Sequence, residues 1–232
     1  MNKVRCWAAT HVDHRRERNE DAYGMSSLGD LPGPPSWHGE LNDVNSWALV
    51  ADGMGGHPAG DVASTLAVAC LGPLLASHWP QLSLGACLEA TDNAIRHAMA
   101  LDPSLTGMGT TIVGMVIRNA RVTTFNAGDS TAWLFTPRRH WLLSEEHCVD
   151  GAVTLWLGGS RTARPIEFDS FDHQAMWGSR ILLCTDGLTN LVQLQAIKEL
   201  IWDDVDPAKA LVDAALAAGG YDNVTVVVVA FP

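Results

Sequence analysis

The sequence has few basic residues, no closely spaced pair of cysteines and no long apolar run. Its 15 Lys and Arg residues are outnumbered by 26 Asp and Glu residues, which gives a formal net charge of -11. This balance excludes a general affinity for nucleic acid or for an anionic membrane, because phosphate groups would be repelled. No segment approaches the roughly 20 apolar residues that span a bilayer, and no signal-peptide pattern precedes the polar stretch 11–21. We therefore expect a cytoplasmic protein without membrane insertion and without a nucleic-acid partner.

The five cysteines are widely spaced, and none forms a Cys-x-x-Cys pair. A disulfide framework is not expected, and most of the cysteines are predicted to be small core residues in a reducing compartment. Cys184 lies two positions before Asp186, which leaves open a redox-sensitive group beside a functional site. His11, Asp13 and His14 leave open a transition-metal site, although a solvated loop is the interpretation that we favour.

The apolar pattern predicts an α+β protein with a single domain over 1–232. Short β-branched runs indicate strands at 3–10, 46–51, 111–117, 122–126, 131–136, 141–143, 180–185 and 224–231, the last of them central. Helical spacing indicates helices over 60–77, 84–101, 193–202 and 207–218, of which the first is broken or kinked at Gly72-Pro73. The close spacing of the strands between 111 and 143 predicts an antiparallel meander. The Pro- and Gly-rich segment 26–45 is predicted to be an irregular loop.

Carboxylates stand at the ends of several predicted strands. Asp52 ends the run 46–51 and opens a glycine-rich turn, and the other acids in such positions are Asp129, Asp186 and Asp222. Two further acids, Glu20 and Asp21, follow a basic stretch near the start of the chain. Acids that gather at one end of a sheet would repel one another unless divalent cations neutralised them. Oxygen ligands without a cysteine pair favour magnesium or manganese over zinc. A tight turn is the alternative interpretation of any one of these motifs.

Six segments, taken in order, resemble the motifs of bacterial type 2C metal-dependent Ser/Thr protein phosphatases. They are Arg16–Asp21, Asp52–His57, Gly107–Thr111, Gly128–Ser130, Thr185–Thr189 and Gly220–Thr225. The resemblance implies a four-layer α-β-β-α sandwich of two antiparallel sheets flanked by helices. It also implies a phosphoserine and phosphothreonine phosphatase that uses two or three Mn2+ or Mg2+ ions, with attack by a metal-bound water or hydroxide.

The resemblance implies metal-binding roles for five residues. Asp52 would bridge two ions. Asp186 and Asp222 would complete the shell of one ion, while Glu20 and the carbonyl of Gly53 would hold the other.

Further roles follow from the same resemblance. Asp129 is a candidate ligand for a weaker third ion. Asp21 would orient the attacking water, and Arg16 would bind the phosphate through its planar fork of donors. Some members of the family have a histidine where this chain has Met54, so the proton donor is open between His57 and a water.

The sequence departs from the family pattern in two places. Thr131 stands where the family commonly has arginine. After His147 only the stretch 148–177 is available for the family's helical flap, so a shortened flap is expected. Arg161 and Arg164 would be its remaining basic residues, and they would meet a phosphopeptide or lie in an exposed loop without a partner.

The partners implied by the resemblance are phosphoproteins, among them a Ser/Thr kinase and its targets, and the chain is expected to be a monomer. Two alternatives remain. The first is a noncatalytic phosphoprotein-binding module that kept the fold. The second is a partner-switching regulator with one phosphoserine substrate.

Overall fold

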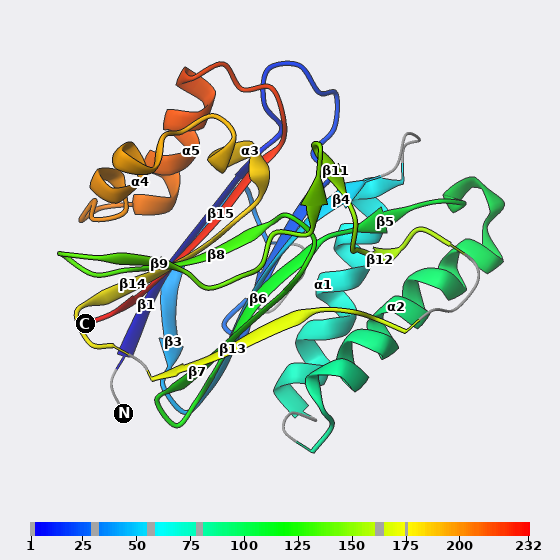
Figure 1. Cartoon of the computed structure of the whole chain (residues 1–232), viewed down its shortest axis with the longest axis horizontal. Helices are drawn as coiled ribbons and strands as arrows, with labels where there is room; N and C mark the ends of the chain where they lie inside the picture. Colours follow the sequence, from blue (N-terminus) through cyan, green and yellow to red (C-terminus); the bar gives the residue numbers. More distant parts are fainter. Residues whose placement is uncertain (1–2, 29–32, 55–58, 78–80, 161–164, 175) are drawn as a thin grey trace.

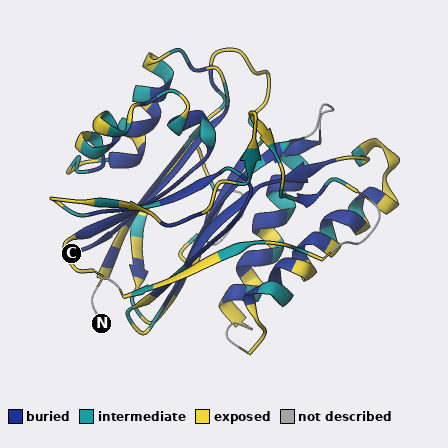
Figure 2. Ribbon diagram, viewed as in Figure 1, coloured by how far each residue is buried: buried dark blue, intermediate teal, exposed yellow. Residues whose placement is uncertain are grey.

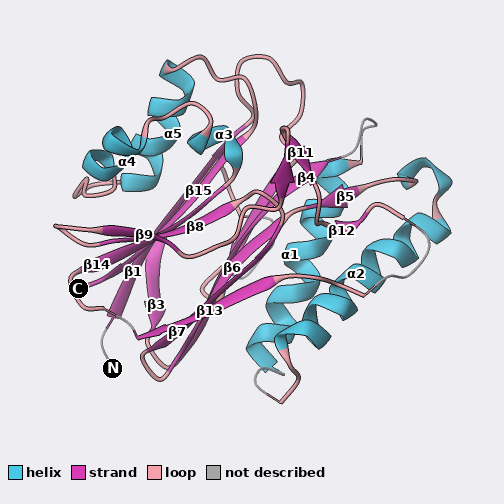
Figure 3. Cartoon of the chain, viewed as in Figure 1, coloured by secondary structure: helices cyan, strands magenta, loops and turns pink. Residues whose placement is uncertain are grey.

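Two antiparallel β-sheets pack face to face between two layers of helices in the computed structural model (Figure 1). The structure describes residues 3–28, 33–54, 59–77, 81–160, 165–174 and 176–232. Helices cover the outer face of each sheet, and the inner faces pack against each other (Figure 3). The predicted four-layer α-β-β-α sandwich is therefore confirmed.

The six-stranded sheet has the order β3-β1-β15-β14-β8-β9. Its strands are β1 (Lys3–His11), β3 (Ser36–Asn42), β8 (Thr131–Phe135), β9 (His140–Leu142), β14 (Ser179–Cys184) and β15 (Val224–Phe231). All eight residues of β15 are buried, and the strand pairs with β1 on one side and β14 on the other. A continuous run of β-branched residues suits a strand that is covered on both faces. The prediction that the last strand is central is confirmed.

The second sheet has the order β12-β5-β4-β6-β7-β13, and β2 also pairs with β4. Its strands are β2 (Asp21–Met25), β4 (Asn45–Met54), β5 (Gly109–Thr110), β6 (Ile112–Arg118), β7 (Arg121–Ala127), β12 (Leu157–Gly158) and β13 (Asp169–Gln174). A separate two-stranded ribbon consists of β10 (Cys148–Val149) and β11 (Ala152–Val153).

The helices lie on the two outer faces of the sandwich (Figure 1). The seven-stranded sheet is covered by α1 (Gly60–Ser77) and α2 (Leu84–Leu101), and a 3-10 turn, η1 (Pro103–Leu105), follows α2. The six-stranded sheet is covered by α3 (Asp186–Thr189), α4 (Leu194–Leu200) and α5 (Pro207–Ala217). The range predicted for the second long helix, 84–101, agrees with α2 at both ends.

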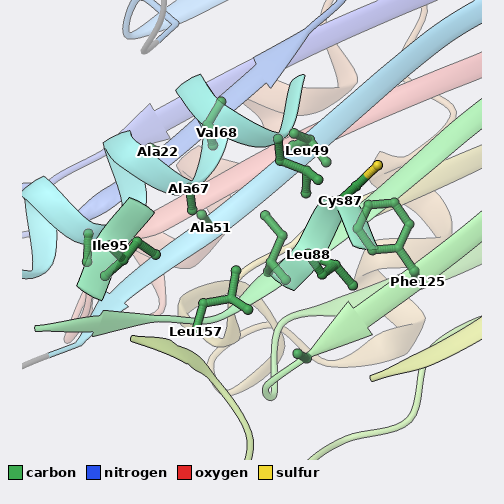
Figure 4. Packing of buried hydrophobic residues seen from close by; sticks show 14 of the residues in the cluster. Ala22, Leu49, Ala51, Ala67, Val68, Cys87, Leu88, Ile95, Phe125 and Leu157 are labelled. Carbon is green, nitrogen blue, oxygen red and sulfur yellow. The ribbon is translucent and has the colours of Figure 1, made fainter. Parts of the chain in front are cut away.

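Three clusters of buried apolar residues fill the spaces between these elements. Figure 2 shows that much of the strand backbone of both sheets belongs to buried residues. Adjacent residues of one strand enter different clusters, as the alternation of side chains along a strand requires. In β4, Leu49 faces α1 and α2, whereas Val50 faces the other sheet. In β15, Val227 faces the other sheet and Val228 faces α4 and α5. Figure 4 shows Leu49 of β4 and Leu88 of α2 within the same buried cluster.

Helix α1 runs without interruption through Pro73. A Cβ on the preceding Gly72 would lie 2.5 Å from the ring of Trp47, so glycine lets the helix approach the sheet closely. By length and composition, α1 is the one helix in the described part of the chain that is apolar enough to cross a membrane. Its buried residues include Ala67 and Leu71, which pack into the cluster beneath α1 and α2. This burial is typical of a core helix.

Two sequence predictions about the strands are wrong. The segment 26–45 contains β3, which pairs with β1 along its whole length from Ser36 to Asn42, although its prolines and glycines suggest a loop. The region 111–143 is not a continuous meander, because β6 and β7 belong to one sheet and β8 and β9 to the other. The chain crosses between the sheets at the turn that contains Gly128, whose φ is +124°.

Candidate active site

Acidic side chains from both sheets meet at one end of the sandwich. Asp21 in β2 and Asp52 in β4 are directly opposite each other in the strand pairing. Asp186 follows β14 and Asp222 precedes β15, so these two acids come from the other sheet. Each of the other three carboxylates raises the pKa of Asp52, which shows that the four groups share one electrostatic environment. The structure thus brings together four of the six acids that were predicted from the sequence to be functional.

The backbone of Asp52 is fixed by two threonines on the neighbouring strand. The carbonyl oxygen of Asp52 accepts the hydroxyl of Thr110 at 2.8 Å and the backbone N–H of Thr111 at 2.9 Å. The backbone N–H of Asp52 donates to Thr111 Oγ1 at 3.0 Å, and that hydroxyl also bonds to Ser130 Oγ at 2.8 Å. These two threonines therefore position the backbone of Asp52.

Asp21 connects the two sheets through its carboxylate. Its Oδ2 accepts the hydroxyl of Thr225 at 2.7 Å and that of Thr185 at 3.1 Å. Its Oδ1 is buried and has no hydrogen-bond partner among the described residues. Burial raises the pKa of Asp21 to about 7, against the lowering effect of the two threonine hydroxyls. The carboxylate therefore has one fixed oxygen and one oxygen that is available to a ligand or a proton.

The crowding of acids raises the pKa of their neighbours as well. Burial is the main cause at Asp186, whose pKa rises to about 6, and nearby Asp129 and Asp222 add to the effect. The pKa of Asp52 rises well above its ordinary value, first through burial and then through the neighbouring carboxylates. The pKa of Asp129 is also raised, mainly by burial and further by Asp222. This arrangement stores repulsion that a cation would relieve.

Glu20, Gly53 and Gly60 form a close-packed corner of the site. A Cβ on Gly60 would lie 2.8 Å from the carbonyl oxygen of Gly53 and 2.9 Å from the carboxyl carbon of Glu20. The backbone N–H of Gly53 donates to the carbonyl of Glu20 at 3.1 Å, and Ser64 Oγ donates to the same carbonyl at 2.6 Å. A missing side chain at Gly60 therefore lets a carboxylate and a backbone carbonyl lie next to each other.

A second glycine lets the ends of β14 and β15 approach each other. A Cβ on Gly187 would lie 2.0 Å from the carbonyl oxygen of Asn223, a distance that no side chain tolerates. The close approach brings Asp186 and Asp222 to the same edge of the sheet. Asp186 Oδ2 accepts a hydrogen bond from Asn190 Nδ2 at 2.9 Å, which orients its carboxylate from α3.

Arg16 lies over the site on the loop that follows β1. Its Nη2 atom contacts Asp222, the residue expected to bind a metal, so the two predicted functional groups form an ion pair. The neighbouring Arg15 lies over the ring of Tyr221, with its guanidinium carbon 4.2 Å from the ring centroid. Asp13 Oδ1 accepts the backbone N–H groups of both arginines and so shapes this loop.

Asn223 fixes the position of the same loop, a role that the sequence analysis missed. Its Nδ2 donates to the carbonyl of Val12 at 2.8 Å and to that of Arg18 at 3.1 Å. Its Oδ1 accepts the backbone N–H of Glu20 at 2.7 Å. One buried amide thereby holds both ends of the loop that carries Arg16. The Asp-Asn pair in the last motif was the available signal, but an amide side chain alone does not indicate which backbone groups it will bond.

The structure supports neither a transition-metal site at His11 nor a redox-sensitive role for Cys184. His11 Nδ1 accepts the backbone N–H of Asp13 at 3.0 Å, so it takes part in the loop and not in a transition-metal site. Cys184 is fully buried, and burial raises the pKa of its thiol to about 12. Its sulfur contacts Thr131 Oγ1 at 3.4 Å, and Trp133 Nε1 donates to the same oxygen at 3.1 Å. Thr131 is thus a buried residue that supports the core.

The predicted flap region begins beside the site. His147 packs against the turn that carries Asp129, because its Nδ1 accepts the backbone N–H of Gly128 at 3.1 Å and its Nε2 contacts Asp169 Oδ2 at 2.7 Å. The region 148–177 contains β10 to β13 and no helix in its described part. His57, Arg161 and Arg164 lie outside the described residues.

A buried ion pair on α2 anchors the end of this region. Asp92 and Arg96 are 3% and 6% exposed in their side chains and pair with each other. Asp92 Oδ1 also accepts the backbone N–H of Gly158 at 2.7 Å, and Arg96 donates to the carbonyl of Ser160. The sequence analysis gave these two residues no role.

The donors at the site suit a hard divalent cation. No three His, Cys, Asp or Glu side chains in the described ranges are close enough to hold an ion by themselves. The site nevertheless offers the free Oδ1 of Asp21, the cluster around Asp52 and the paired oxygens of Glu20 and Gly53. Magnesium and manganese accept such oxygen donors, and magnesium usually keeps several waters, so few protein ligands are needed for each ion. The residues present therefore fit Mn2+ or Mg2+.

Comparison with known proteins identifies protein phosphatases that are similar to this chain. The family model described as protein phosphatase 2C matches residues 36–217. The Ser/Thr protein phosphatase PstP of Mycobacterium tuberculosis is 32% identical over 206 residues, which cover 77% of this chain and 39% of that protein. The chain therefore spans less than half the length of this relative. The Ser/Thr phosphatase stp of Listeria monocytogenes is 29% identical over 221 residues, covering 82% of this chain and 86% of the relative.

Solved structures extend the similarity to the whole fold. The catalytic domain of PstP in complex with two manganese ions is 28% identical, with a TM-score of 0.79 and coverage of 98% of both chains. The Ser/Thr phosphatase of S. agalactiae shares the fold at a TM-score of 0.82 and 24% identity, covering 99% of this chain. The shortened flap stays a prediction.

Proposed function

Because this chain belongs to the protein phosphatase 2C family, we propose that it is a Mn2+- or Mg2+-dependent phosphatase of phosphoserine and phosphothreonine in proteins. The observation that carries the proposal is the convergence of Asp21, Asp52, Asp186 and Asp222 from two different sheets. Bringing four mutually repelling carboxylates together at a partly buried place is unfavourable unless the site binds cations. No observation favours the noncatalytic or partner-switching alternatives.

The residues that would hold the ions are those that the family resemblance implies. Asp52 is at the centre of the acidic cluster and would bridge two ions. Asp186 and Asp222 would complete the shell of one, and Glu20 with the carbonyl of Gly53 would hold the other. The more peripheral Asp129 would contribute to a third, weaker site.

The bound ions would neutralise the carboxylates, polarise the phosphate and lower the pKa of water. The chain itself would supply orientation and proton handling. The Oδ1 of Asp21 is free to accept a proton or a hydrogen bond from the attacking water, since Thr185 and Thr225 hold its other oxygen. Arg16 would exchange Asp222 for the nonbridging oxygens of the phosphate, which its planar guanidinium binds in bidentate fashion. The proton donor for the leaving oxygen would be a water or His57.

Partners and location belong to the same proposal. Phosphoproteins would be the substrates, including a Ser/Thr kinase and its targets. The chain would act in the cytoplasm as a monomeric catalytic domain over 1–232, with no nucleic-acid partner because its net charge is -11.

Phosphate release from a phosphoserine or phosphothreonine peptide tests this function. We expect release to require Mn2+ or Mg2+, to stop on addition of EDTA, and to be lost in Asp52→Asn and Asp186→Asn. Asp213→Asn is the matched control, because Asp213 is exposed on α5, where it pairs with Lys209. Activity that survives EDTA in the wild-type protein would reject the proposal.

A further inference from the structure

A basic and aromatic cavity of about 300 Å3 lies between the β8–β9 hairpin and the α4 region. The residues that matter in its lining are Arg138, Arg139, His140, Trp141, Lys198 and Trp202. It is separate from the acidic cluster, because β8 begins beside the site at Thr131 and ends at Phe135. At roughly 3.3 Å per residue, this strand carries the hairpin turn about 15 Å away from the carboxylates. Figure 1 shows the hairpin projecting beyond the sheet beneath α4.

The cavity concentrates positive charge on an acidic protein. Within the described part of the chain, Arg138, Arg139 and Lys198 form no ion pair. The nearby acids on α4 and after it are engaged elsewhere. Glu199 accepts a hydrogen bond from Gln195, and Asp203 accepts backbone N–H groups. Three cations that form no ion pair with the described residues point to an anionic ligand.

Two of the three cationic groups, Arg138 and Arg139, lie on a hydrogen-bonded turn, and Lys198 lies on α4. The backbone N–H of Thr136 donates to the carbonyl of Arg139 at 2.8 Å, and Thr136 Oγ1 accepts the backbone N–H of Arg139 at 3.0 Å. The rings of Trp133, Phe135 and His140 stack beside this turn with centroids 6.2 to 6.3 Å apart. A ligand would therefore meet a preorganised surface, which reduces the entropic cost of binding.

The cavity continues into an open strand edge. β9 is the last strand of the six-stranded sheet, and no described residue pairs with its outer edge. Its residues Trp141 and Leu142 are 40% and 41% exposed. An extended peptide can add to such an edge through backbone hydrogen bonds while its side chains enter an adjacent pocket. This continuity favours a peptide over a compact nucleotide as the occupant.

We propose that the cavity between the β8–β9 hairpin and α4 is a docking site for an acidic peptide segment of the protein substrate. The peptide would extend along β9, with its carboxylates or phosphates contacting Arg138, Arg139 and Lys198 and its apolar side chains contacting Trp141. The identification of the ligand as substrate rests on the proposed phosphatase function, whereas the binding of an acidic peptide does not.

Fluorescence anisotropy with a labelled, Glu-rich peptide that contains no Ser, Thr or Tyr tests the binding directly. We expect saturable binding that weakens about tenfold in Arg138→Glu, as the loss of one charge-assisted hydrogen bond implies, and that also weakens in Trp141→Ala. Arg121→Glu is the matched control, because Arg121 is an exposed arginine on β7 of the other sheet. The Arg121→Glu variant should bind the peptide with the wild-type affinity.

Kinetics then connect the docking site to catalysis. In Arg138→Glu, KM for a phosphoprotein with an acidic tract should rise about tenfold, while hydrolysis of p-nitrophenyl phosphate stays at the wild-type rate. Equal weakening in Arg121→Glu would overturn the proposal by showing nonspecific attraction. Binding of ATP in place of the peptide, with the same dependence on Arg138, would overturn it in favour of a nucleotide site. If wild-type protein hydrolyses neither substrate, the phosphatase function fails, and the anisotropy still decides on the peptide site.

Discussion

The Nη2 atom of Arg16 lies 2.9 Å from each carboxylate oxygen of Asp222. The two side chains are 50% and 43% exposed, so water screens the pair and its contribution to stability is about 0–1 kcal/mol. A cation would bind Asp222 more strongly than Arg16 does, and a phosphate would bind Arg16 more strongly than Asp222 does. We therefore expect that binding of the ions and the substrate opens this pair.

Removing the guanidinium should separate substrate binding from metal binding. In Arg16→Ala we expect kcat/KM for a phosphopeptide to fall about 100-fold, because one preorganised contact to the phosphate is lost. Affinity for Mn2+, measured by isothermal titration calorimetry, should stay equal or increase, since Asp222 loses its competing partner. Arg16→Lys keeps the charge but not the planar fork, and it should restore part of the activity. A large loss of Mn2+ affinity in Arg16→Ala would contradict this account.

The metal-free protein should lose stability as the pH rises. Burial raises the pKa of Asp21 to about 7 and that of Asp186 to about 6, so the folded state binds more protons than the unfolded state above pH values of about 4. The free energy of unfolding therefore decreases as the pH rises from about 4 to 7. Urea denaturation in EDTA should give a higher midpoint at about pH 5 than at pH 8.

Asp21→Asn provides the control for this pH dependence. The amide cannot ionise, and its oxygen can still accept the hydroxyls of Thr185 and Thr225, so the midpoint in EDTA should change less between the two pH values. The same pH dependence in Asp21→Asn and wild type would show that other groups cause it.

Truncation of Asn223 should affect both stability and activity. Asn223→Ala removes three hydrogen bonds and leaves Val12, Arg18 and Glu20 with unsatisfied backbone groups. At about 1 kcal/mol for each buried bond, we expect a loss of about 2–4 kcal/mol in the free energy of unfolding. Because the loop carries Arg16, KM for a phosphopeptide should also rise at temperatures where the variant is fully folded. A stability loss without a change in KM would limit Asn223 to a structural role.

The buried pair on α2 should be far more sensitive than exposed pairs. Asp92→Asn leaves the charge of Arg96 buried without its counterion, which costs about 3–5 kcal/mol. The matched comparison is Asp213→Asn, which breaks the exposed Lys209–Asp213 pair and should cost at most about 1 kcal/mol. Urea denaturation of the two variants measures the difference, and similar losses would show that Asp92 does not stabilise the fold through this pair.

Periodicity predicted the long elements because it reflects burial directly. The ranges of α2 and of the central β15 were predictable, since each has a regular apolar pattern over many residues. β3 was not, because Gly39 lies within it and prolines precede it, so pairing with β1 overrides its local sequence. The division of β7 and β8 between two sheets depends on how the sheets pack, and spacing along the chain does not contain that information.

The acidic residues of the site were predictable for a similar reason. A carboxylate such as Asp52 at the end of an apolar strand stands out in the sequence. Its supporting groups do not, because Thr111, Thr185 and Asn223 are ordinary strand and turn residues until the fold places a partner beside them. The pairing of Arg16 with Asp222 joins residues 206 positions apart, which no local pattern encodes.

Asp21 and Asp52 lie in strands of one sheet, whereas Asp186 follows β14 and Asp222 precedes β15 of the other sheet. Ions bound jointly by these side chains would therefore link the two sheets of the sandwich. The ions would bind only the native state. The melting temperature should therefore increase with the logarithm of the free Mn2+ concentration once binding begins to saturate. The thermal stability of this protein and its catalytic activity would then both depend on the concentration of free Mn2+.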